Sequence, residues 1–139
     1  TEIFPVTSAR SIVKLSGERA EKRQERWQEI VIAACEQCGR NRITTVPPLL
    51  PLSQRLQPLP QSDVRLLMGL HHPTSLKAIQ PARQRITLMI GPEGGWSPEE
   101  EAAAFQRGFQ SILLGKRVLR TETAALAAIA AMQTLWGEF

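Results

Sequence analysis

The stretch 86–100, ITLMIGPEGGWSPEE, contains a predicted strand, a glycine-rich loop and a predicted helix in direct succession. Its apolar start, 86–90, shows no alternation of polar and apolar residues, which is typical of a strand buried on both faces of a parallel sheet. The Ser-Pro-Glu-Glu sequence that begins at Ser97 carries a cap, a first-turn proline and a capping-box glutamate, and it predicts a helix over 98–107. The glycine-rich segment 91–95 joins the two elements where open α/β sheets bind ligands.

The other expected elements are also short and bounded by turn residues. Strands are expected over 64–70 and 111–114, an amphipathic helix over 18–39, a short helix within 73–81, and an apolar helix over 122–136. Five of the ten prolines fall within 41–60, where we expect irregular structure with one short helical turn near 53–56. Strands that alternate with helices indicate an α/β fold, and the last helix should be buried between layers or in a subunit interface.

Length and charge limit the class of protein. The chain has 139 residues, of which 42% are apolar, and this is enough for one domain with its own core but too short for two substantial ones. Seventeen Lys and Arg against thirteen Asp and Glu give a net charge of +4, which supports a polyanionic partner such as RNA only weakly. A bilayer span needs about 20 consecutive apolar residues, and we expect no membrane partner. The start at Thr1 suggests that sequence is missing upstream.

The two cysteines, Cys35 and Cys38, form a Cys-Glu-Gln-Cys motif that is typical of redox or zinc sites. Both fall at the C-terminal end of the first expected helix, where the helix dipole disfavours a thiolate. A structural zinc site needs four ligands, and only His71 and His72 could complete it. We therefore expect no metal. Two cysteines are also too few for the dense disulfide framework of a small secreted domain, so we expect a reducing, cytoplasmic location.

A second candidate site is the segment 114–124, LGKRVLRTETA, which again joins a strand to a helix. Arg120 could hold a planar or anionic partner through two hydrogen bonds, while Glu122 and Thr123 bring polar groups to a helix N-terminus. The alternative is an exposed turn in which Arg120 pairs with Glu122. For 91–95 the alternative is a tight turn, because the loop has neither dinucleotide-binding nor P-loop spacing.

Together these segments resemble the RsmE-type ribosomal RNA methyltransferases of the SPOUT superfamily, which methylate N3 of a uridine in the decoding region of 16S rRNA. The matching segments are RSIVK at 10–14, ERW at 25–27, EQCGRN at 36–41, and the two loops at 90–95 and 114–124. The resemblance implies a parallel sheet flanked by helices, a C-terminal trefoil knot, a homodimer and S-adenosylmethionine as cofactor. It also implies an N-terminal RNA-binding domain of PUA type, and the start of the catalytic domain, which this chain lacks.

The family's three cofactor loops correspond to Leu70 with His71, to 91–94 and to 114–124. The cofactor-binding residues implied in this way are Leu70, His71, Ile90, Gly91, Glu93, Gly94, Leu114, Gly115, Val118, Leu119, Arg120, Thr123 and Ala124. Arg10 and Arg120 are the expected cations that stabilise negative charge on the uracil ring, and Glu122 or Glu93 could accept its proton. Two alternatives remain: a knotted methyltransferase that modifies transfer RNA or another ribosomal site, and a non-catalytic module that binds RNA or assists assembly.

Overall fold

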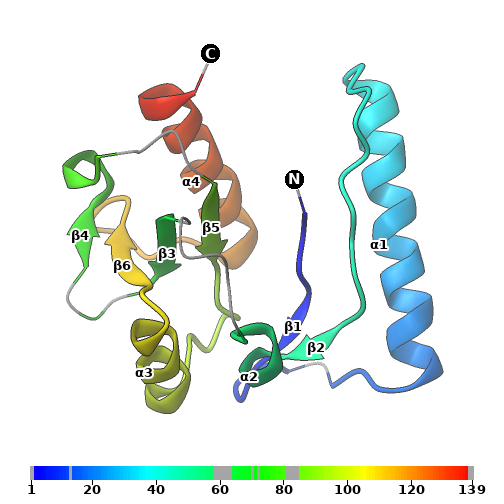
Figure 1. Cartoon of the computed structure of the whole chain (residues 1–139), viewed down its shortest axis with the longest axis horizontal. Coiled ribbons are helices and arrows are strands. Elements are labelled where there is room, and N and C mark those ends of the chain that lie inside the picture. Colours follow the sequence, from blue (N-terminus) through cyan, green and yellow to red (C-terminus); the bar gives the residue numbers. More distant parts are fainter. Residues whose placement is uncertain are drawn as a thin grey trace. The chain divides into compact units, whose positions relative to one another are not determined.

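The computed structural model describes residues 2–12, 14–57, 64–69, 71, 73–80 and 85–137 (Figure 1). They fall into two compact units, one built from 1–7 and 11–55 and the other from 8–10 and 56–139. Both units contain helices and parallel strands, so the predicted α/β class is confirmed. The expectation that the chain forms a single domain stays a prediction. No helix among the described residues is long and apolar enough to cross a membrane.

The first unit is dominated by helix α1, Glu18–Gln37, which confirms the helix predicted over 18–39. The chain turns at Gly39, where φ is 69°, and runs back as an extended segment. The Gln28 side chain fixes this segment, because its amide nitrogen donates to the Thr44 carbonyl oxygen at 3.0 Å and its amide oxygen accepts from the Val46 amide at 2.9 Å. One polar side chain of the helix thus satisfies two backbone groups of an otherwise irregular segment.

The rest of this unit is small. Strand β1, Val6–Thr7, pairs in parallel with β2, Leu50–Pro51, and the short helix α2, Leu52–Arg55, follows directly. The helical turn predicted near 53–56 is therefore confirmed. Arg55 lies over the Phe4 ring with 4.6 Å between the guanidinium carbon and the ring centroid.

The second unit contains a four-stranded sheet in which every pair is parallel. Its strands are β3 (Val64–Met68), β4 (Thr74–Ser75), β5 (Ile86–Met89) and β6 (Gln110–Leu113), in the order β4-β6-β3-β5. The strands predicted over 64–70, 86–90 and 111–114 are confirmed. The segment 73–81, which was expected to hold a short helix, holds β4 and the 3-10 helix η1, Leu76–Ala78.

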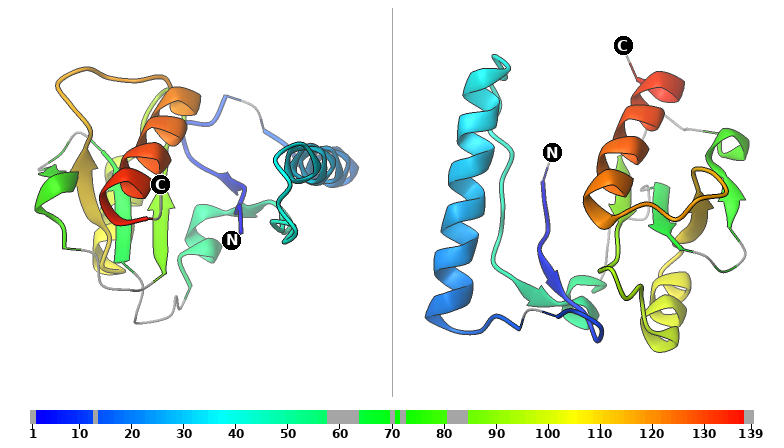
Figure 2. Two further views of the ribbon diagram at one scale, coloured as in Figure 1. Left: turned by 90° about the horizontal axis from the view of Figure 1, so that it is seen from above. Right: turned by 180° about the vertical axis from the view of Figure 1, so that it is seen from behind.

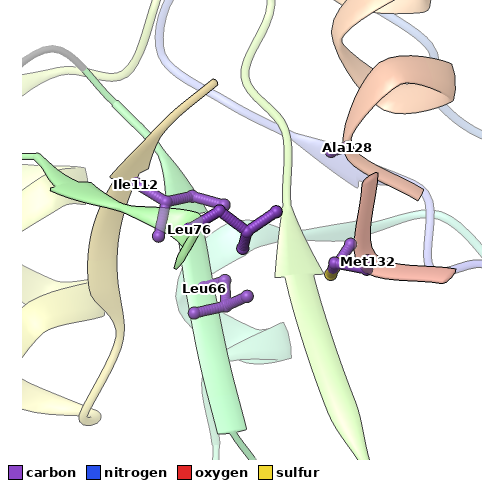
Figure 3. Close-up of a cluster of buried hydrophobic side chains, with 5 residues drawn as sticks. All are labelled: Leu66, Leu76, Ile112, Ala128 and Met132. Carbon is purple, nitrogen blue, oxygen red and sulfur yellow. The ribbon is translucent and has the colours of Figure 1, made fainter. Parts of the chain in front are cut away.

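Two helices cover this sheet on opposite faces. Helix α4, Thr121–Trp136, packs on the face that carries Leu66 and Ile112, and these residues form a buried cluster with Leu76, Ala128 and Met132 (Figures 2 and 3). Side chains alternate along a strand, so Leu67 and Ser111, both buried, point to the other face.

Helix α3, Pro98–Gln106, belongs to this other face. A Cβ built at Gly69, after the end of β3, would lie 3.6 Å from Glu101 near the start of α3. Arg65, near the start of β3, donates to the Arg107 carbonyl oxygen at the end of α3. The N-terminus of α3 therefore lies at the carboxyl edge of the sheet.

The outer face of α4 bears on one expectation. The helix was expected to be buried between layers or in a subunit interface, but Leu126 is 72% exposed and Ile129 is 52% exposed. Burial between layers holds only for the face that carries Ala124, Ala128 and Met132. The part of the chain that the structure describes leaves the other apolar face uncovered, and burial of this face in a subunit interface stays a prediction.

Candidate active site

Three loops meet at the carboxyl edge of the second unit's sheet. Strands β3, β5 and β6 are parallel and in near register, with Leu67 opposite both Met89 and Ser111, so their ends lie side by side. Loops that follow parallel strands at one edge are the usual place for ligand sites in α/β proteins. The segments that were predicted to bind a cofactor follow these three strands.

The loop after β5 is tight and leaves little space for side chains. A Cβ built at Gly91 would lie 3.1 Å from two atoms of the Trp96 indole, which is itself buried. The turn closes when the Gly95 amide donates to the Pro92 carbonyl oxygen at 2.8 Å, with Gly95 at a φ of 70°. Glycine is needed at these two positions because of the close approach to Trp96 and the positive φ.

The start of α4 is bound to the same loop. The Thr121 hydroxyl donates to the Gly91 carbonyl oxygen at 3.0 Å. Because β6 and β5 lie on opposite sides of β3, the segment 114–120 has to pass across the end of β3 to reach this position. The second and third predicted loops are therefore brought together. Thr121 was within the quoted motif but was not predicted as a site residue.

The loop after β6 lines a cavity of about 430 Å³. Its lining residues are Leu114, Gly115, Lys116, Arg117 and Leu119. Three of them were predicted from the sequence, and the two cations were not, although the density of charge in the motif was the available signal. The cavity falls within the range of about 300–1,000 Å³ that is typical of small-molecule sites. Val118, also predicted, is 79% exposed.

Arg10 reaches the loop after β5 from the other end of the chain. Its guanidinium Nη1 donates to the Gly94 carbonyl oxygen at 2.9 Å, and a Cβ built at Gly94 would lie 3.2 Å from the Arg10 Cβ. The Ala9 amide donates to Glu100 Oε1 at 2.8 Å. Arg10 is thus placed beside Gly94, which was predicted to bind the cofactor, and its Nη1 also lies 3.9 Å from a Cβ built at Gly95.

The α3 N-terminus next to Arg10 carries the predicted capping box. The Glu100 amide donates to the Ser97 hydroxyl at 3.2 Å, and the Ser97 amide donates to Glu100 Oε2 at 2.9 Å. The Ser97 hydroxyl also donates to Glu99 at 2.7 Å. This hydrogen bond, then a backbone hydrogen bond and the nearby charge of Arg10, hold the pKa of Glu99 below its ordinary value.

In the loop after β3, the structure describes His71 but not Leu70, so the prediction for Leu70 lies outside the described residues. His71 Nδ1 lies 2.7 Å from Glu101 Oε2, in a pair whose histidine is 72% exposed and whose carboxylate is 12% exposed. A second cavity, of about 390 Å³, opens beside it and is lined by His71, Thr74, Phe105, Phe109, Gln110 and Ser111.

The remaining predicted residues lie around the α4 N-terminus and in the loop after β5. Arg120 is the N-cap residue of α4, and its side chain is exposed, as are those of Glu122 and Thr123. The alternative in which Arg120 pairs with Glu122 is not realised, because the ion pairs of the described residues do not include one between them. Ala124 is buried, and its amide donates to the Arg120 carbonyl oxygen at 2.7 Å. Glu93 is exposed, whereas Ile90 is half-buried.

The two cysteines belong to the first unit, whereas the loops of the candidate site belong to the second. Cys35 is buried and Cys38 is exposed, and both thiols are free. Among the described residues, no group of three or more His, Cys, Asp or Glu side chains is arranged to hold a metal ion.

Comparison with known proteins places these observations in a family. The RNA methyltransferase domain family matches residues 1–133 of the chain. The ribosomal RNA small subunit methyltransferase E of Buchnera aphidicola is 33% identical over 115 residues, which cover 83% of this chain and 46% of the relative. The enzyme of the same name from Mesomycoplasma hyopneumoniae is 36% identical over 125 residues, which cover 90% of this chain and 54% of the relative.

Two solved structures are also similar. The crystal structure of a ribosomal RNA small subunit methyltransferase E from Neisseria gonorrhoeae, bound to S-adenosyl methionine, has a TM-score of 0.93 and 54% sequence identity, and covers 98% of this chain and 56% of that one. The structure of a putative methyltransferase from Legionella pneumophila, in complex with the same cofactor, has a TM-score of 0.84 and 36% sequence identity. The match covers 94% of this chain and 54% of the Legionella chain. The resemblance inferred from the sequence is confirmed. The chain spans about half the length of these relatives.

Proposed function

The chain belongs to the RNA methyltransferase domain family, and from this premise we propose that it transfers a methyl group from S-adenosylmethionine to N3 of a uridine in the decoding region of 16S ribosomal RNA. The observation that carries the proposal is the joining of the loops after β5 and β6 at one sheet edge, where the Thr121 hydroxyl holds the Gly91 carbonyl and the Arg10 guanidinium holds the Gly94 carbonyl. Two similar structures that bind this cofactor support it.

The residues at the sheet edge fit S-adenosylmethionine. Backbone groups of Gly91 and Gly94 can approach a ligand closely, because neither residue has a side chain in the way. The cavity lined by Leu114, Gly115 and Leu119 provides apolar walls with backbone groups between them. We propose that these five residues hold the cofactor together with the other predicted members of the three loops.

The bound cofactor would supply a methyl group activated by a positively charged sulfur. The protein must then align the uridine with the methyl carbon and exclude water. The new bond forms between N3 and the methyl carbon as the carbon–sulfur bond breaks, and the N3 proton passes to a carboxylate, for which Glu122 and Glu93 are the candidates. Negative charge spreads to the uracil carbonyl oxygens, and we assign its stabilisation to Arg120 and Arg10.

RNA is the proposed partner because cations gather around these loops. Lys116 and Arg117 line the cavity, while Arg10 and Arg120 are exposed beside the loops that form it. Such a group of cations suits contacts with RNA phosphates. The target uridine would leave its stack to enter the site, as bases do when proteins read or modify them. Ribosomal RNA as the substrate also favours the cytoplasm as the location.

We also propose the trefoil knot. Strand β6 lies between β3 and β4, although β3 and β4 are consecutive in the chain. The chain therefore moves from one side of β6 to the other between these two strands, while the loop 114–120 crosses the end of β3. Chains whose connections cross in this way are rare, and two crossings at one sheet edge favour a knotted path.

A homodimer is the proposed assembly, with a second copy of the chain on the outer face of α4. Leu126 and Ile129 are one turn apart on this face and are 72% and 52% exposed. Exposed apolar side chains that gather on one helix mark an interaction surface, and the absence of charge among them favours an apolar partner.

The test is methylation of small ribosomal subunits from a strain that lacks the gene, by the full natural protein with S-adenosylmethionine. Mass spectrometry of digested 16S rRNA should find one new N3-methyluridine in the decoding region. A methyl group on another nucleotide would instead support a related knotted enzyme. If the protein binds the cofactor but methylates neither ribosomal nor transfer RNA, the result would support the alternative of a non-catalytic RNA-binding or assembly module.

A further inference from the structure

Glu100 uses both of its carboxylate oxygens, for two different purposes. Oε2 accepts from the Ser97 amide at 2.9 Å, which is the ordinary capping bond of α3. Oε1 accepts from the Ala9 amide at 2.8 Å, across 91 residues of sequence. A capping box requires only the first contact. The second contact fixes the backbone that leads into Arg10.

The position of this contact matters because Arg10 is bound to the loop after β5. The Arg10 guanidinium donates to the Gly94 carbonyl oxygen at 2.9 Å. The Arg10 Cβ also lies 3.2 Å from a Cβ built at Gly94, so a side chain at position 94 would be in tight contact with Arg10. Glu100 therefore holds one end of the segment 8–10 at the α3 N-terminus, while Gly94 holds the Arg10 head. The Ala9 contact thus adds a backbone restraint, next to Arg10 in the chain, to the hydrogen bond that its guanidinium makes.

We infer that Glu100 is a positioning residue for methyl transfer, which acts by holding Ala9 so that Arg10 stays on the Gly94 carbonyl. This inference rests on the proposed function, in which Arg10 stabilises charge on the uracil ring. The two oxygens of the Glu100 carboxylate accept from the Ala9 and Ser97 amides, and neither amide belongs to the predicted cofactor-binding residues. Its effect on the reaction passes through Arg10.

Substitution by glutamine separates the two purposes of Glu100. Glutamine also serves in capping boxes, so in Glu100→Gln the amide oxygen can accept from Ser97 and keep the cap. The amide NH2 group would then face the Ala9 N–H, and two donors cannot bond. Ser97→Ala is the reciprocal variant, because it removes the hydroxyl that caps the Glu100 amide and leaves both carboxylate oxygens in place.

The first measurement is hydrogen exchange at the Ala9 amide in the full natural protein, which does not depend on activity. Glu100→Gln should speed exchange about tenfold, the effect of losing a hydrogen bond to a charged group, while Ser97→Ala should leave it within about twofold. Ser97→Ala should instead lower the Tm by a few degrees, because a cap is lost. Unchanged exchange in Glu100→Gln would overturn the inference.

The second measurement is single-turnover methyl transfer to small ribosomal subunits. Glu100→Gln should slow transfer about tenfold with cofactor affinity within about twofold, and Ser97→Ala should transfer at nearly the normal rate. In an Arg10→Ala background, Glu100→Gln should cause little further loss, because the residue it positions is gone. Multiplicative losses in the double variant, or normal transfer by Glu100→Gln, would overturn the inference. An inactive wild type would contradict the proposed function instead, and hydrogen exchange would still decide the Ala9 contact.

Discussion

The Thr121 hydroxyl donates a hydrogen bond to the Gly91 carbonyl oxygen at 3.0 Å, and thereby joins the first residue of α4 to the glycine-rich loop after β5. Gly91 lies in the loop after β5, whereas Thr121 begins the helix that follows the loop after β6, and β5 and β6 are not adjacent in the sheet. A carbonyl fixed from outside the loop also fixes the amides that follow it, and these backbone groups are the proposed contacts to the cofactor. The Thr121 hydrogen bond therefore fixes the backbone of the glycine-rich loop, although Thr121 itself is not among the proposed cofactor contacts.

We predict that Thr121→Val weakens S-adenosylmethionine binding about fivefold, which corresponds to about 1 kcal/mol for one lost hydrogen bond. Valine keeps the shape of the side chain and removes the donor. Thr134→Val is the control, because the Thr134 hydroxyl donates to the Ala130 carbonyl oxygen within the same helix. Calorimetric titration measures both variants, and equal affinities would contradict a role for the Thr121 contact.

The elements that the sequence predicts correctly are those specified by neighbouring residues. The α3 N-terminus follows from Ser97, Pro98 and Glu100, because a capping box involves only residues three positions apart. Strand β4 was missed, since a strand of two residues is defined by its pairing with β6, which comes more than 30 residues later. Its local sequence carries no period that could distinguish it from a short helix.

For the site the same limit applies. The glycines and the charged motif are visible in the sequence, because glycine spacing and charge density are local properties. The contacts Thr121 to Gly91 and Ala9 to Glu100 join residues 30 and 91 positions apart, so they exist only once the strands are ordered. A single sequence indicates candidate loops for the site, but not which side chains hold these loops together.

Gly91→Ala should destabilise the fold by about 1–3 kcal/mol, the usual cost of overpacking. The added methyl group would lie 3.1 Å from the Trp96 indole, a ring that is buried and cannot easily move. Gly115→Ala is the matched control, because no atom lies within 4 Å of its added methyl group. Urea denaturation gives both free energies of unfolding. Equal values for the two variants would mean that Trp96 does not confine position 91.

A charge on the outer face of α4 should separate the proposed dimer. Leu126 is 72% exposed, so Leu126→Glu should leave the fold of one chain intact and bury an unpaired carboxylate in the dimer interface. We expect sedimentation to show monomers of the variant at micromolar concentration, with a normal circular dichroism spectrum. Gln106→Glu, which adds the same charge at the exposed end of α3, should stay dimeric. A dimer of Leu126→Glu would place the interface elsewhere.

Stability at acid pH should depend on Glu99. Folding lowers the pKa of Glu99 from its ordinary 4.5, because the Ser97 hydroxyl donates to the carboxylate. The unfolded chain therefore binds the proton more readily, so this contribution is present above pH 4.5 and is lost as the pH falls through the lower folded value. Glu99→Gln should show a smaller fall in Tm than the wild type between about pH 6 and pH 3. Glu93→Gln, also exposed, is the control, and parallel curves for Glu99→Gln and wild type would exclude the effect.

The last prediction is that Arg120→Ala reduces methyl transfer far more than it reduces cofactor binding. Arg120 caps α4 directly beside Thr121, and its backbone carbonyl accepts from the Ala124 amide, so the backbone around it is fixed without its side chain. The guanidinium itself is exposed, and the ion pairs of the described residues do not include one between it and Glu122. A purely structural side chain at this position would therefore have little to stabilise.

If the Arg120 guanidinium meets the negative charge that develops on the uracil ring, its loss should cost about 3 kcal/mol at the transition state, on the scale of a lost oxyanion donor. This corresponds to a rate loss of about a hundredfold in single-turnover methylation, with the dissociation constant of S-adenosylmethionine changed by less than about threefold. Arg23→Ala, which removes one exposed positive charge from α1, controls for weaker general attraction to RNA. Because catalysis by charge stabilisation acts only in the transition state, saturating RNA should not restore the rate of Arg120→Ala. Near-normal turnover in Arg120→Ala would remove the residue from the catalytic assignment and leave Arg10 as the cation beside the substrate.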